Sequence, residues 1–132
     1  MSAHDLGFNR MPTPWGPSQD TWQLAPGIYA VSTASHGGIL IGRKVARARL
    51  SLAAQAAGEP WGAWLAFEED CDWAIPALEI PEVADSGWYS GTPVELREYA
   101  RGCVYRWNPE YAQARGWPIA PEGLETDYDR GP

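Results

Sequence analysis

The stretch "VSTASHGGILIG", Val31–Gly42, decides how the first half of the chain folds. Apolar and β-branched segments flank Ser35-His36-Gly37-Gly38, a pattern typical of two antiparallel strands joined by a short turn. We therefore predict strands over residues 27–34 and 38–42, and we expect the two glycines to adopt positive φ angles in the connection. The turn also contains one of the two histidines of the chain.

The serine and histidine of this turn do not fit a nucleophile elbow. Such an elbow places its serine between a strand and a helix and takes its histidine from elsewhere. Ser35 and His36 are adjacent, and a strand follows them. Two interpretations stay open for His36: a turn residue that hydrogen bonds to nearby backbone, or part of a composite catalytic site with Cys71 or with nearby carboxylates.

The middle of the chain predicts one helix and a third strand. Residues 43–57 are rich in good helix formers and end at Gly58, which we expect to cap one continuous helix. Residues 62–70 alternate between the two faces of a strand. Residues 71–88 contain two prolines, which indicates a short helical turn or an irregular crossover.

Two further helices begin at recognisable caps. Thr92, Pro93 and Glu95 form a capping box that opens a helix ending near Trp107. Asn108 is expected to cap a shorter helix that follows directly, with Gly116 past its end.

The two ends of the chain lack a periodic pattern. Residues 1–26 are rich in Pro, Gly and Trp and predict an extended arm, and residues 117–132 predict an irregular acidic tail. A chain of 132 residues fits one domain. The expected fold is α+β: a small antiparallel sheet of about three to four strands packed against two to three helices.

Composition restricts the compartment. No apolar run approaches the length of a membrane span, and the first residues lack the pattern of a secretory signal, so a cytoplasmic location is expected. Cys71 and Cys103 are too few for a disulfide framework and are expected as free thiols.

Charge is distributed unevenly along the chain. The formal net charge is -7, and residues 67–132 carry fourteen acids against five arginines. We name residues 67–87 the acidic segment, because it has seven carboxylates and no basic residue. Its carboxylates are Glu68, Glu69, Asp70, Asp72, Glu79, Glu82 and Asp85. The basic cluster Arg43–Arg49 is expected to face this segment, within one molecule or between two.

The acidic segment favours a protein partner over a nucleic acid or a metal. A net negative charge argues against direct binding of nucleic acid. The segment lacks the ligand spacing of a calcium loop, and the chain has too few cysteines and histidines near one another for zinc, so we expect no metal or cofactor. Carboxylates interleaved with Trp73 and Trp88 as apolar anchors would fit a basic groove that normally binds nucleic acid. The simpler alternative is a solvated face.

Three stretches of the chain carry a resemblance to a known domain. "TPWGPSQ" (Thr13–Gln19), "VSTASHGGI" (Val31–Ile39) and "FEEDCDWAIP" (Phe67–Pro76) resemble, in this order, an uncharacterised domain of unknown function from phages and plasmids of proteobacteria. The resemblance covers roughly residues 12–110 and implies a mobile element, where small accessory proteins often blunt host defence. If the turn and the acidic stretch recur together, it also implies that His36 lies near Glu69, Asp70 or Cys71.

These observations lead to one main function and two alternatives. The main expectation is an anti-CRISPR-like inhibitor that presents its acidic face to a host nucleic-acid-binding complex. One alternative is an enzyme centred on His36 and Cys71 or on nearby carboxylates. The other is a structural or morphogenetic phage protein.

Overall fold

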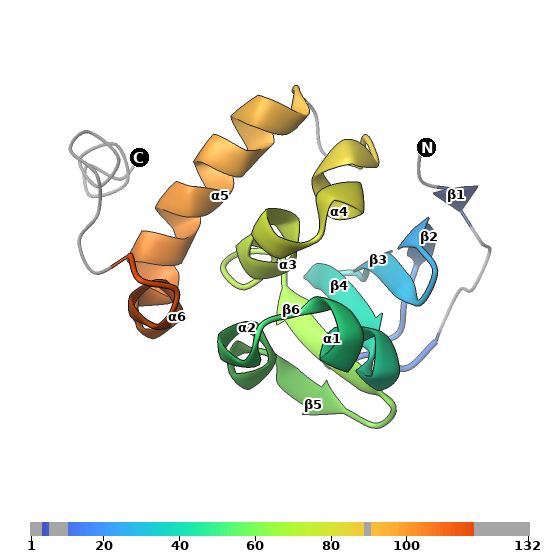
Figure 1. The fold of residues 1–132 in the computed structure, drawn as a ribbon. Helices are drawn as coiled ribbons and strands as arrows, with labels where there is room; N and C mark the ends of the chain where they lie inside the picture. Colours follow the sequence, from blue (N-terminus) through green and yellow to red (C-terminus); the bar gives the residue numbers. More distant parts are fainter. Residues whose placement is uncertain (1–3, 6–10, 89–90, 118–132) are drawn as a thin grey trace.

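The computed structural model describes residues 4–5, 11–88 and 91–117, and it has an α+β fold. One antiparallel sheet in the order β1-β2-β3-β4-β6-β5 is covered by helices (Figure 1). The strands are β1 (His4–Asp5), β2 (Asp20–Ala25), β3 (Ile28–Ser32), β4 (Gly37–Gly42), β5 (Glu59–Trp61) and β6 (Trp64–Glu68). The helices are α1 (Arg43–Arg49), α2 (Leu52–Ala57), α3 (Ala74–Glu79), α4 (Pro81–Asp85), α5 (Pro93–Trp107) and α6 (Pro109–Ala114). The predicted fold class is confirmed, with more strands than expected.

The N-terminal region is not simply an extended arm. Residues 20–25 form β2, which pairs with β3 in the sheet. Ala25 pairs with Ile28, so the connection is the pair Pro26-Gly27, and Gly27 has a φ angle of 75°. Proline followed by a glycine with positive φ fits a type II turn. The last residue of the predicted arm, Pro26, therefore closes a hairpin together with Gly27.

The glycines of β4 serve close packing rather than a turn. Neither Gly37 nor Gly38 has a positive φ angle, so this part of the prediction is wrong. A Cβ atom on Gly38 would collide with the backbone oxygen of Phe67 and would lie 2.5 Å from a ring carbon of Trp15. The turn is instead closed by Thr33, whose backbone N–H donates to the His36 carbonyl at 2.7 Å. The Thr33 hydroxyl also donates to that carbonyl and accepts from the His36 N–H.

The predicted helix over residues 43–57 is divided into α1 and α2. Leu50 is extended, with φ -107° and ψ 145°, and its side chain is buried in the core. Ser51 caps α2 by accepting a hydrogen bond from the Ala54 N–H at 3.1 Å. Gly58 is also extended, and a Cβ atom there would lie 2.5 Å from Cγ of Leu65. It is therefore required for close approach to β6, not as a left-handed cap.

Two further segments, residues 59–61 and residues 71–88, contain elements that the sequence did not predict in this form. The edge strand β5 contains Pro60, which lacks a backbone donor and is tolerated at a sheet edge. Residues 71–88 contain two short helices, and Pro81 opens α4 at its first position.

The C-terminal helices follow their predicted caps only in part. The capping box of α5 is confirmed, because Thr92 and Glu95 exchange hydrogen bonds at 2.9 and 3.1 Å. Asn108 makes no side-chain capping bond to α6; its amide donates to the Asp72 carboxylate at 3.1 Å. Residues 118–132 of the predicted tail lie outside the described residues. No helix in the described ranges is long and apolar enough to cross a membrane.

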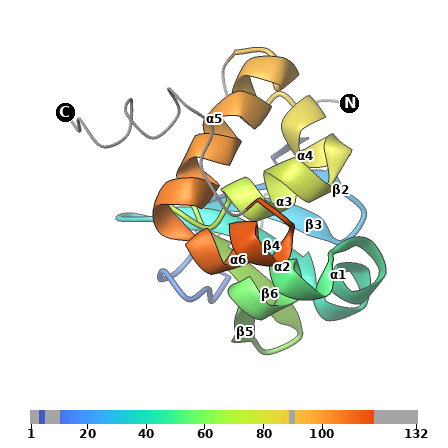
Figure 2. The ribbon, with the colours of Figure 1, turned by 60° about the vertical axis from the view of Figure 1, so that its left-hand side comes forward.

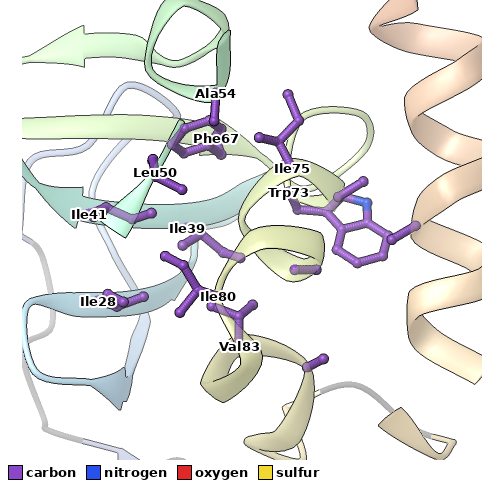
Figure 3. Packing of buried hydrophobic residues seen from close by; sticks show 14 of the residues in the cluster. Ile28, Ile39, Ile41, Leu50, Ala54, Phe67, Trp73, Ile75, Ile80 and Val83 are labelled. Atoms are coloured by element: carbon purple, nitrogen blue, oxygen red, sulfur yellow. The ribbon is translucent and has the colours of Figure 1, made fainter. Parts of the chain in front are cut away.

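Most of the core lies between the sheet and its helices. Figure 3 shows how side chains from the sheet meet those of α2, α3 and α4. The labelled residues are Ile28, Ile39, Ile41, Leu50, Ala54, Phe67, Trp73, Ile75, Ile80 and Val83. A smaller cluster of Val31, Leu40 and Ala66 lies on the other face of the sheet, where Met11 and Trp15 pack against it. The central strands β3, β4 and β6 are thus buried on both faces.

Candidate functional site

The candidate site lies where two strands of the sheet end side by side. We name residues 68–72 the acidic turn, because Glu68 ends β6 and three more carboxylates follow at Glu69, Asp70 and Asp72. Glu68 pairs with Gly38 in the sheet, and the Glu69 N–H donates to the Gly37 carbonyl at 3.0 Å. The acidic turn is therefore held next to the β3–β4 turn that contains His36.

The structure brings His36 together with two of these acids. Nδ1 of His36 lies 3.6 Å from a carboxylate oxygen of Asp70, and both side chains are well exposed. One ligand atom from each of His36, Glu68 and Asp70 lies within 4.8 Å of the other two. The expectation that His36 approaches the acidic stretch is confirmed for Asp70.

Cys71 does not have the environment of a reactive cysteine. Burial and then the negative charge of Asp72, with a smaller contribution from Glu68, raise the pKa of Cys71 to about 12. The thiol therefore stays protonated near neutral pH, whereas a nucleophile must be a thiolate. These electrostatics argue against a thiolate dyad with His36. Cys71 and Cys103 are thiols that do not take part in a disulfide.

Two acids of the helices are neutralised by arginines from other elements. Both carboxylate oxygens of Glu82 accept hydrogen bonds from Arg49 at 2.7 Å, and these bonds lower the pKa of Glu82 to about 2. Asp85 accepts a hydrogen bond from Arg97 at 3.0 Å. The basic cluster thus reaches the acidic segment within one molecule, at Arg49. Arg43 instead donates to the Gly62 carbonyl at 2.7 Å.

Glu79 is a buried structural acid. Its side chain is only 7% exposed and accepts hydrogen bonds from the Ser51 N–H and hydroxyl, both at 2.7 Å. The Tyr111 hydroxyl also donates to it, and Nε of Arg115 lies 3.7 Å away. Burial and then this hydrogen bond raise the pKa of Tyr111 well above its ordinary value. Glu79, like Glu82 and Asp85, was expected on a free acidic face; the structure instead engages all three within the fold.

Neither of the predicted tryptophan anchors is a fully exposed side chain. Trp73 is 2% exposed and belongs to the core, and Trp88 is partly buried against it, so neither is an exposed anchor. The exposed aromatic near the acidic turn is Tyr99 of α5, which is 54% exposed and stacks on Trp73 at 5.8 Å. Its pKa is raised by the neighbouring Cys103, by burial and by the charge of Asp70. No local pattern in the sequence indicated that Tyr99 belongs to this site. Its contact with Trp73 depends on how α5 packs against α3, which lies far away in the chain.

A surface pocket lies elsewhere, between α2 and α6. Figure 2 shows these two short helices next to each other, away from α4. The pocket has a volume of about 400 Å³ and is lined by both apolar and polar groups, among them Ala53, Trp107, Asn108 and Glu110. Tyr111 also lines it, but its hydroxyl is engaged by Glu79. This pocket does not hold a recognisable set of catalytic groups.

The fold and this geometry together define the class of the protein. It is an α+β domain with an acidic turn at one end of its sheet. Residues 9–130 match the family described as a domain of unknown function, DUF7007, and the chain belongs to this family. No curated protein and no solved structure is a significant match to it. A link to phages, plasmids or CRISPR inhibition stays a prediction.

Proposed function

We propose that this protein acts by binding another protein through the acidic turn. Its target is a host nucleic-acid-binding defence complex, which it inhibits in the manner of an anti-CRISPR protein. The proposal includes the expected setting: a mobile element whose product acts in the bacterial cytoplasm. It uses a smaller surface than the whole acidic segment, because Glu79, Glu82 and Asp85 are engaged within the fold.

The observation that supports this proposal is the unusual density of negative charge in the acidic turn. Four of its five residues are carboxylates, and in the described part of the chain none of them forms an ion pair with lysine or arginine. Closely spaced negative charges next to the paired ends of two strands resemble the phosphates that basic grooves recognise. Because β4 and β6 fix the turn, little conformational entropy is lost on binding.

Tyr99 supplies an apolar contact beside these charges. Tyrosine combines a large aromatic surface with a polar tip, and such residues are enriched in protein interfaces. Electrostatic attraction would guide the encounter, and Tyr99 would add affinity that salt does not screen. The raised pKa of Cys71 argues against one form of the competing enzyme hypothesis, the thiolate dyad of Cys71 and His36, and leaves the form that uses His36 and nearby carboxylates open.

The experiment compares two charge reversals of equal size. Glu69→Lys with Asp70→Lys alters the acidic turn, whereas Glu59→Lys with Glu110→Lys alters exposed acids on β5 and α6. Purified CRISPR effector complexes are mixed with labelled target DNA, and DNA binding is measured with each protein. We expect wild type and the Glu59/Glu110 control to block DNA binding, and the acidic-turn variant to fail. Inhibition should also weaken at about 0.5 M salt, which screens surface charges.

Two outcomes contradict the proposal. If the acidic-turn variant inhibits as well as wild type, the turn is a solvated face. If both charge-reversed proteins lose inhibition equally, the effect follows net charge rather than this surface. Circular dichroism of both variants establishes that each is folded before the comparison is made.

A further inference from the structure

We infer that His36, Glu68 and Asp70 form a binding site for a divalent transition-metal ion of the Zn²⁺ type. One potential ligand atom from each residue lies within 4.8 Å of the other two. The site joins the β3–β4 turn to the end of β6. It does not depend on the proposed function, because a metal ion could bind whether or not a partner exists.

The spacing of the His36 and Asp70 atoms fits two ligands of one ion better than it fits a hydrogen bond. Nδ1 of His36 and the Asp70 oxygen are 3.6 Å apart, which is too far for a hydrogen bond. Zn²⁺ binds nitrogen and oxygen at about 2.0–2.2 Å, so two ligands at a tetrahedral ion are about 3.3–3.6 Å apart. These two atoms therefore already have the separation that an ion between them requires. Glu68 completes the set after a small side-chain movement.

The backbone brings these ligands together before any ion binds. Gly38 and Glu68 are paired across β4 and β6, and the Glu69 N–H donates to the Gly37 carbonyl at 3.0 Å. Thr33 holds the backbone of His36 through hydrogen bonds at 2.6 and 3.1 Å. Binding therefore needs side-chain ordering but no rearrangement of the sheet.

The donor chemistry selects among ions. Two carboxylates bring two negative charges to a divalent cation, and a neutral imidazole adds a nitrogen ligand. Imidazole favours Zn²⁺ and its transition-metal neighbours, whereas Mg²⁺ and Ca²⁺ prefer oxygen alone. Three protein ligands leave a position for water. The expectation of no metal was based on the scarcity of cysteine and histidine along the sequence. In the folded chain, one histidine lies next to two acids that are distant from it in the sequence.

The test is calorimetric titration of the full chain with ZnCl₂. Wild type should bind one ion per chain, and His36→Ala should weaken binding by about tenfold or more. His4→Ala is the matched control, because it removes the other histidine and should bind Zn²⁺ like wild type. Glu68→Gln and Asp70→Asn keep the side-chain shapes and should each weaken binding, whereas Cys71→Ser should retain it.

The proposal is overturned by either of two results. One is a wild-type protein that binds no Zn²⁺ at about 1 mM; the other is Zn²⁺ binding that His36→Ala leaves unchanged. The test is separable from that of the proposed function, because His36→Ala removes a ligand but keeps every carboxylate of the acidic turn. Repeating the DNA-binding assay with EDTA shows whether inhibition depends on the ion.

Discussion

Between residues 68 and 72 no carboxylate pairs with a lysine or arginine in the described part of the chain, whereas each of Glu79, Glu82 and Asp85 pairs with an arginine from elsewhere in the fold. Both regions are acidic in the sequence, with four carboxylates in residues 68–72 and three in residues 79–85, and neither contains a basic residue. They differ because α3 and α4 pack between the sheet and α5, where arginines of α1 and α5 and the hydroxyl of Tyr111 can reach them. Counting charges along a chain therefore does not reveal which charges are available to a partner.

The largest effect on stability is expected from removal of the buried carboxylate of Glu79. Glu79→Ala leaves the Ser51 and Tyr111 donors without their acceptor in a buried place. We expect the free energy of unfolding to fall by about 3 kcal/mol, measured by urea denaturation. The matched control, Glu69→Ala in the acidic turn, should change stability by less than about 0.5 kcal/mol. Similar losses for both variants would remove the distinction between the two regions.

A smaller effect is expected from the glycine that aligns β4 with the acidic turn. Gly38→Ala places a methyl group against the backbone of Phe67 and the ring of Trp15. Trp15 can shift but the backbone of β6 cannot move freely, so we expect a loss of about 2–3 kcal/mol in urea denaturation. Gly62→Ala is not a suitable control because Gly62 has a positive φ of 56°. Retention of full stability by Gly38→Ala would show that β4 and β6 have more space than the structure indicates.

The ion pair of the helical region should contribute less. A double-mutant cycle with Arg49→Ala and Glu82→Gln should give a coupling free energy of about 0.5–1 kcal/mol, because both side chains are partly exposed. The folded-state pKa of Glu82, about 2, is below the usual value of 4.5. The stabilisation is therefore present above pH 4.5 and is lost as the pH falls toward 2. A coupling that does not change over this range would contradict the ion pair.

The smallest expected effect concerns the cysteine of the acidic turn. Because the pKa of Cys71 is raised to about 12, iodoacetamide should label it more than about tenfold more slowly than a free cysteine peptide at neutral pH. Cys71→Ser should alter stability by less than about 0.5 kcal/mol. Labelling as fast as that of the peptide would restore the thiolate dyad as a hypothesis.

Local signals in the sequence predicted the elements that depend on neighbouring residues. The capping box of Thr92 and Glu95 is confirmed, because both hydrogen bonds join residues three apart. The β3–β4 hairpin is confirmed for the same reason, although its glycines have another role. Elements that depend on distant residues were missed: the division between α1 and α2 involves Glu79, and Asn108 binds Asp72 instead of capping α6.

By itself the sequence determined the α+β class and the uneven charge, because periodicity, caps and composition are properties of short stretches. Only the tertiary structure decided which acids are exposed, that Trp73 is buried, and that His36 lies beside Asp70. The physical reason is that burial and electrostatic partnership depend on contacts between elements that are far apart in the chain. Sheet pairing of β4 with β6 and packing of α3 against α5 create those contacts.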